Sequence, residues 1–102
     1  MKKYCLALLV ITVFLVSSAM AIDCPSATVA NIQVEGNVIF VFPTGQNWHL
    51  VGSLSDMGTK EKYAALLAAQ MAGKQVTIRF PDGYNCSAYD LSIPSLMVRT
   101  IG

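Results

Sequence analysis

The chain has 102 residues, which is enough for one domain. Its formal net charge is +1 at neutral pH, so it lacks the excess of Lys and Arg on which nucleic-acid binding depends. Hydrophobic residues make up 54% of the chain, but an apolar run near the N-terminus raises that fraction, so the fraction alone does not indicate a membrane protein.

The N-terminal 21 residues have the composition of a secretory signal peptide. Two lysines precede an apolar run over 6–16, and residues 19–21 have the small-x-small form of a signal-peptidase site. The run is shorter than the roughly 20 residues that a membrane span takes, although a retained anchor is the alternative. We predict cleavage after Ala21, leaving one periplasmic or secreted domain of residues 22–102 without stable membrane insertion.

Cleavage would leave two cysteines, Cys24 and Cys86. It would also leave five Lys and Arg against six Asp and Glu, a net charge of −1. An even pair of cysteines in an oxidising compartment favours a disulfide. Closing a loop of about 60 residues contributes roughly 4 kcal/mol in the chain-entropy model. A metal or redox site is the alternative, but two distant cysteines and one histidine do not fit usual metal sites.

Three strands are predicted ahead of a helix. Residues 28–34 alternate in polarity, and residues 38–42 are apolar on both faces, which is typical of a central strand. Residues 48–51 form a short third strand, and Gly52 marks a bulge or bend after it. The alternation in 28–34 puts four residues on one face: Thr28, Ala30, Ile32 and Val34.

The helix is the clearest local signal. It is predicted to begin at an N-cap residue, Thr59, and to end at Gly73 in the left-handed conformation. Its expected core stripe comprises Tyr63, Leu66 or Leu67, and Met71.

A strand with clean alternation follows over 75–80, and a polar-aromatic loop follows over 84–90. The last strand, within 91–101, is interrupted by Pro94, which argues for an edge position or a bulge.

The order of elements is strand-strand-strand-helix-strand-strand. A five-stranded Greek-key barrel is the architecture of the OB-fold, and a helix between its third and fourth strands would plug one end. We therefore predict a mainly β domain with one helix, built as a five-stranded OB-like barrel. A generic α+β sheet with one helix on a face is the alternative.

The segment 63–80, YAALLAAQMAGKQVTIRF, resembles the helix-to-strand segment of small secreted bacterial OB-fold proteins. These are similar to the B subunits of subtilase cytotoxin and related pentameric toxins. The later segment 84–86 is consistent with that pattern. The resemblance implies an exported, glycan-binding module and a homo-oligomeric ring. This chain is shorter than the toxin subunits, so their glycan-binding residues are not transferred to it.

Five residues are candidates for ligand binding. Tyr84, Asn85 and Tyr89 lie beside Cys86 and could stack on and hydrogen-bond a sugar or a peptide; alternatively, they pack over the disulfide. We expect His49 at the surface and its neighbour Trp48 in the core. The opposite register of that strand would make Trp48 an exposed stacking platform.

Catalysis is not expected. Ser53, Ser55 and Asp56 follow His49 closely, but a nucleophilic triad needs side chains that converge from separately positioned elements. No G-x-S-x-G turn is present, and we predict no enzyme, cofactor or metal site. The expected function is an exported binding module for a glycan or for a host or envelope surface molecule. The alternative is a periplasmic structural domain that binds another exported protein at the sheet edge marked by Pro94.

Overall fold

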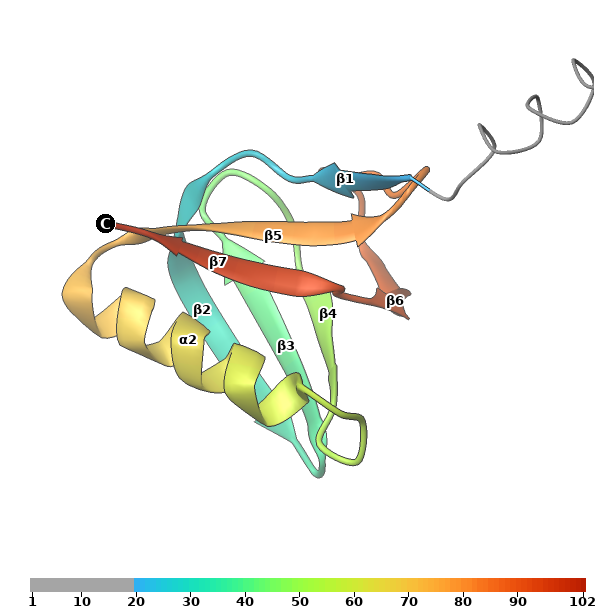
Figure 1. Cartoon of the computed structure of the whole chain (residues 1–102), viewed down its shortest axis with the longest axis horizontal. Coiled ribbons are helices and arrows are strands. Elements are labelled where there is room, and N and C mark those ends of the chain that lie inside the picture. Colours follow the sequence, from blue (N-terminus) through green and yellow to red (C-terminus); the bar gives the residue numbers. More distant parts are fainter. Residues whose placement is uncertain (1–19) are drawn as a thin grey trace, which may run out of the picture.

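The structure is a computed structural model that describes residues 20–102. Nearly all of the predicted signal peptide, residues 1–19, therefore lies outside the described residues. The described part is mainly β with one helix and a curled sheet (Figure 1). Its elements are β1 (Ala21–Asp23), β2 (Ala27–Glu35), β3 (Val38–Pro43), β4 (His49–Ser53), α2 (Thr59–Ala72), β5 (Gln75–Pro81), β6 (Asp90–Pro94) and β7 (Met97–Ile101).

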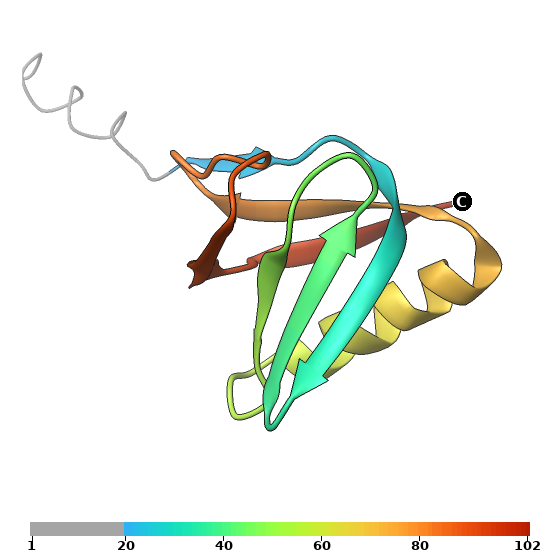
Figure 2. The same cartoon turned by 180° about the vertical axis from the view of Figure 1, so that it is seen from behind.

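The strand order is β1-β5-β2-β3-β4-β6, and β7 pairs with β5. All pairings are antiparallel except that of β4 with β6, which is parallel. The helix packs against β2, β4, β5 and β7, on one side of the curled sheet. Figure 2 shows β2, β3 and β4 from the other side, with α2 behind them. In residues 20–102, no helix has the length and apolar character to cross a membrane.

The prediction of five strands in a simple order is wrong in two places. A short strand, β1, precedes the first predicted strand, and the last predicted strand is divided into β6 and β7. The division follows from Pro94, which has no N–H to continue the ladder. Beyond it, the Ser95 N–H donates to the Leu50 carbonyl at 3.0 Å, and the Leu96 N–H donates to the Arg79 carbonyl at 2.7 Å. At this break, the strand that the chain hydrogen-bonds to therefore changes from β4 to β5.

A bulge in β2 changes which of its residues lie on the same face of the sheet, compared with the prediction. Val29 pairs with Pro43 and Asn31 pairs with Phe42, so Ala30 is the extra residue and does not share a face with Ile32. Val29 is buried before the bulge. After the bulge, Ile32 is half-buried, and three residues face outward beside β3: Asn31, Gln33 and Glu35.

The helix packs through a narrower stripe than predicted. Leu66 and Ala69 are buried, whereas Leu67 is 37% exposed and Met71 is 81% exposed, so Met71 was wrongly assigned to the core. The buried residues of α2 are Thr59, Leu66 and Ala69, and the predicted Tyr63 is partly buried against the core. The predicted left-handed end at Gly73 is confirmed by its φ of 68°.

Thr59 is not the N-cap, which is Gly58. It is the first helical residue, and its side chain is buried against β4. A Cβ at Gly52 would lie 2.5 Å from the Thr59 Oγ1 atom, so only glycine leaves room for this contact. The predicted bend at Gly52 is thus the place where the helix begins to pack on the sheet.

The predicted disulfide between Cys24 and Cys86 is confirmed, with a Cα–Cα distance of 5.6 Å. Cys24 lies between β1 and β2, and its N–H donates to the Ile78 carbonyl on β5 at 2.9 Å. Cys86 lies in the loop that follows β5. The bond therefore ties this loop to the first strands across 62 residues of sequence.

Replacing both Cys24 and Cys86 by alanine should lower the free energy of unfolding by roughly 4 kcal/mol, because the unfolded chain regains the entropy of a long open loop. Urea unfolding followed by circular dichroism measures the change. Reduced wild-type protein is the matched control and should show the same stability as the double variant. A loss below about 1 kcal/mol would contradict this role.

Candidate functional site

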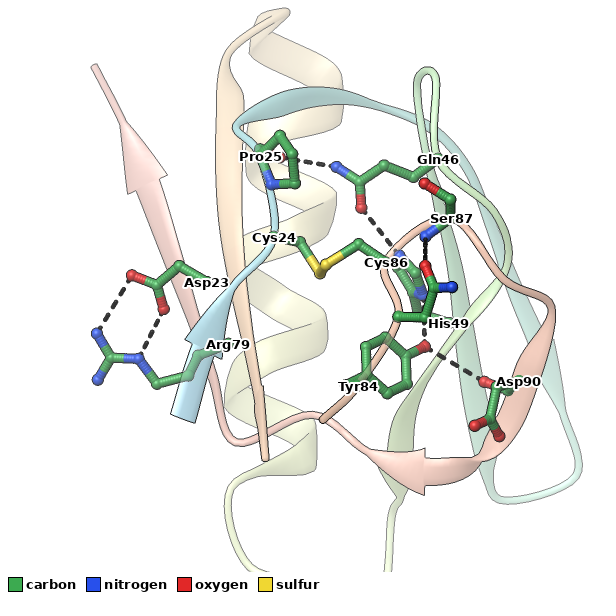
Figure 3. Close-up of a disulfide and its surroundings, with 11 residues drawn as sticks. Asp23, Cys24, Pro25, Gln46, His49, Arg79, Tyr84, Cys86, Ser87 and Asp90 are labelled. Carbon is green, nitrogen blue, oxygen red and sulfur yellow. Dashed lines mark hydrogen bonds and ion pairs between the residues drawn. A yellow bond between two sulfur atoms is a disulfide. The ribbon is translucent and has the colours of Figure 1, made fainter. Parts of the chain in front are cut away.

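His49 is fully buried, so the prediction that it lies at the surface is wrong. It pairs with Val41, whose side chain is also fully buried, and the two therefore share the inner face of the sheet. Its Nδ1 lies 2.6 Å from the Tyr84 hydroxyl, and its Nε2 lies 2.9 Å from Oε1 of Gln46 (Figure 3). Burial of this polar ring is possible because both ring nitrogens have partners.

The hydrogen bonds of Gln46 assign the protons of this network. Its Nε2 donates to the Pro25 carbonyl at 2.7 Å, so its Oε1 faces His49 as an acceptor. The His49 Nε2 then carries the proton, and Nδ1 accepts from the hydroxyl of Tyr84 at 2.6 Å. This is the shorter of two contacts of that hydroxyl, which also lies 3.3 Å from the Asp90 carbonyl. Burial lowers the pKa of His49 to about 4, which keeps the imidazole neutral at pH 7.

Tyr84 belongs to the core and is not a ligand-facing residue. Its ring stacks on Phe80 with a centroid distance of 3.9 Å, and it is only 6% exposed. Burial, together with the charge of Asp90, raises the pKa of Tyr84 to about 12. Of the two alternatives for this tyrosine, packing inside the domain is the one observed.

Asn85 is exposed, and its Oδ1 accepts from the Ser87 N–H at 2.9 Å. It shapes the turn of the loop that carries Cys86. The Ser-His-Asp grouping is not assembled, because both nitrogens of His49 bond elsewhere and the Ser53 hydroxyl bonds that of Ser55 at 2.8 Å. Among residues 20–102, no cluster of three or more His, Cys, Asp or Glu could hold a metal ion.

The inward position of His49 turns the preceding residue, Trp48, toward the outer face of the sheet, so the expected core position of Trp48 is wrong and the opposite register is the one observed. There it lines a hollow of about 170 Å³, which we call the aromatic hollow. Its walls come from β2, β3, β6 and the segments leading into β4 and β6. The lining residues are Gln33, Glu35, Phe40, Trp48, Tyr89 and Leu91.

The two predicted residues in the aromatic hollow differ in how firmly they are held. The half-buried Trp48 contacts Phe42 edge to face, with a centroid distance of 5.5 Å and an interplanar angle of 78°. The backbone N–H of Trp48 donates to Asn47 Oδ1 at 2.8 Å. Tyr89 is 68% exposed. The hollow therefore pairs a supported aromatic ring with an exposed one.

The remaining walls were missed by the sequence interpretation. Phe40 pairs directly with Gln33, so both point to the outer face, and Glu35 follows two residues later on that face. The Nε2 of Gln33 donates to a carboxylate oxygen of Glu35. The available signal was the alternation of Gln33 and Glu35 beside a strand that is apolar on both faces.

Comparison of the chain with models of protein families, with curated proteins and with solved structures finds no match. The resemblance to toxin B subunits therefore gains no support from these comparisons. A function for this chain has to be argued from the aromatic hollow and the elements that form it.

The low pKa of His49 predicts that the domain loses stability as the pH falls from 7. An unfolded chain binds a proton on this histidine near its ordinary pKa of 6.5, whereas the native state resists protonation down to about pH 4. The free energy of unfolding should therefore drop by about 2 kcal/mol between pH 7 and pH 5. Urea titrations at several pH values measure this slope.

His49→Gln is the matched variant and should remove most of the slope, whatever it does to stability at pH 7. Asp23 and Asp90 titrate below this range, because hydrogen bonds to Arg79 and to Ser92 lower their pKa values from 3.8. Equal slopes in wild type and His49→Gln would show that burial of this ring is not the cause.

Proposed function

We propose that this domain is a binding module that takes a glycan in the aromatic hollow. The observation that carries the proposal is the meeting of Trp48 and Tyr89 with the polar pair Gln33 and Glu35 in one hollow. Sugars present apolar C–H faces and a rim of hydroxyl groups. A site that combines aromatic rings with a few hydrogen-bonding groups is suited to both features.

We also propose that the fold is an OB-like barrel. The proposal counts β6 and β7 as one interrupted strand and β1 as an addition, leaving five strands with a helix between the third and fourth. The antiparallel pairings β2–β3, β3–β4 and β2–β5, the parallel pairing β4–β6 and the antiparallel pairing β5–β7 support it. OB-folds bind oligosaccharides on the face of their second and third strands and on adjacent loops.

That binding face would correspond to the outer face of β3 and β4. The aromatic hollow lies there, with Phe40 on β3, Trp48 beside β4 and Tyr89 in the loop before β6. Export forms part of the proposal, and the disulfide Cys24–Cys86 is compatible with it. A homo-oligomeric ring like that of the toxin B subunits is the corresponding proposal for assembly.

A second candidate function is binding of another exported protein at a sheet edge. The short strands β1 and β6 end the main strand order, and Pro94 closes β6. Unpaired strand edges are sites where an extended segment of a partner can add. This function would not depend on the aromatic ring of Trp48.

Trp48→Ala should weaken glycan binding at least tenfold, because a supported indole provides most of the stacking surface of the hollow. Tyr89→Ala should weaken it less, since this ring is more exposed. Binding to a glycan array, followed by calorimetry with the best ligand, measures both effects. Met71→Ala, which changes an 81% exposed residue on α2, is the control and should bind as wild type does.

A glycan array without any bound ligand, together with a monomeric mass in solution, would refute the glycan-binding module. Equal binding by wild type and Trp48→Ala would instead refute the assignment of the site. Recovery of an exported protein partner by both proteins would favour binding at a sheet edge.

A further inference from the structure

We propose that the aromatic hollow selects sugars without negative charge and that Glu35 rejects acidic sugars such as sialic acids. This inference rests on the proposed glycan-binding function and adds the chemical class of the ligand. The charged side chains of residues 20–102 are distributed unevenly around the hollow.

Glu35 is the charged residue among the six that line the hollow. It stands at the end of β2, paired with Val38, and its side chain shares the outer face with Gln33 and Phe40. The adjacent Asp90 lies in sequence between Tyr89 and Leu91, which both line the hollow. Its carboxylate accepts from the Ser92 N–H at 2.9 Å and from the Ser92 hydroxyl at 2.6 Å.

The cations of the described chain lie on other elements. Those in residues 20–102 are Lys60 and Lys62 on α2, Lys74 after it, Arg79 on β5 and Arg99 on β7. None of them belongs to β2, β3, β4 or β6, and none lines the hollow.

Three of these cations are already engaged. The guanidinium of Arg79 lies 2.7 Å from Asp23, and that of Arg99 lies 3.9 Å from the same carboxylate. The ammonium of Lys62 donates to the Ser95 carbonyl at 2.7 Å. An acidic sugar in the hollow would therefore meet a carboxylate and find no cation to pair with.

Proteins that bind carboxylate groups generally do so with Arg or Lys, or with several converging N–H donors. Without them, an anion loses its hydration against a like charge, and that loss is unfavourable. Neutral sugars carry no charge that Glu35 would repel. Their hydroxyl groups can donate to the Glu35 carboxylate, which the bond from Gln33 holds in place.

Matched pairs of neutral and sialylated glycans test this inference. Lactose with 3′-sialyllactose, and the corresponding N-acetyllactosamine pair, can be immobilised together with a wider neutral panel. Wild-type protein should bind the neutral member of a recognised pair about tenfold more tightly at low salt. The preference should shrink as salt is raised, since the repulsion acts between partly exposed charges.

Glu35→Gln removes the charge and keeps a hydrogen-bonding side chain of the same length. It should reduce the preference for the neutral glycan to about threefold or less, chiefly through better binding of the sialylated member. Glu61→Gln, which neutralises an exposed carboxylate on α2, is the matched control and should keep the wild-type preference. Circular dichroism checks that both variants fold.

The two levels of the proposal fail in different ways. Tighter binding of sialylated glycans by wild type, or a preference unchanged by Glu35→Gln, would overturn the inference and leave glycan binding intact. An array on which neither wild type nor Glu35→Gln binds any glycan would overturn the proposed function and this inference with it.

Discussion

The buried hydrogen bonds of His49 determine which side of β4 faces the core, and much of the remaining structure depends on that choice. Gln46 and Tyr84 satisfy both nitrogens of the ring, so a polar residue occupies an inner position at no cost in unpaired groups. Trp48, which directly precedes His49 in the chain, is thereby placed on the opposite face of the sheet. One internal network thus both closes the core and turns the half-buried Trp48 toward the outer face of the sheet.

Sequence reasoning succeeded where the signal was local or where the residues left a single choice. The helix and its end at Gly73 follow from short-range propensity, and the pairing of Cys24 with Cys86 follows from their number and the expected compartment. It failed where distant segments decide the outcome. The partners that permit burial of His49 come from a turn three residues earlier in the chain and from a loop 35 residues later, and alternation alone does not say which face of a strand is inward.

The same limit explains the candidate site. Trp48 and Tyr89 were among the candidates, although Trp48 was expected in the core, whereas Gln33 and Glu35 were missed. Alternation puts these two residues on one face of β2, but only the pairing of β2 with β3 places that face beside Phe40. For Tyr84, both a ligand contact and packing inside the domain were open from the sequence, and its stacking on Phe80 shows that it packs inside the domain. The charges are also segregated. The basic residues of the described chain lie on α2, β5, β7 and the turn after α2, whereas the hollow with Glu35 is formed mainly by β2, β3 and β6.

The contact between Gly52 and Thr59 has an evolutionary consequence. A side chain at position 52 would meet the Thr59 hydroxyl at 2.5 Å, and the φ of 154° at this glycine is itself unfavourable for other residues. Any homologue that keeps the start of the helix against β4 must therefore keep glycine at 52, or accept a smaller residue at 59 and a shifted strand. These two positions should vary together among relatives of this chain, even though neither of them lines the aromatic hollow.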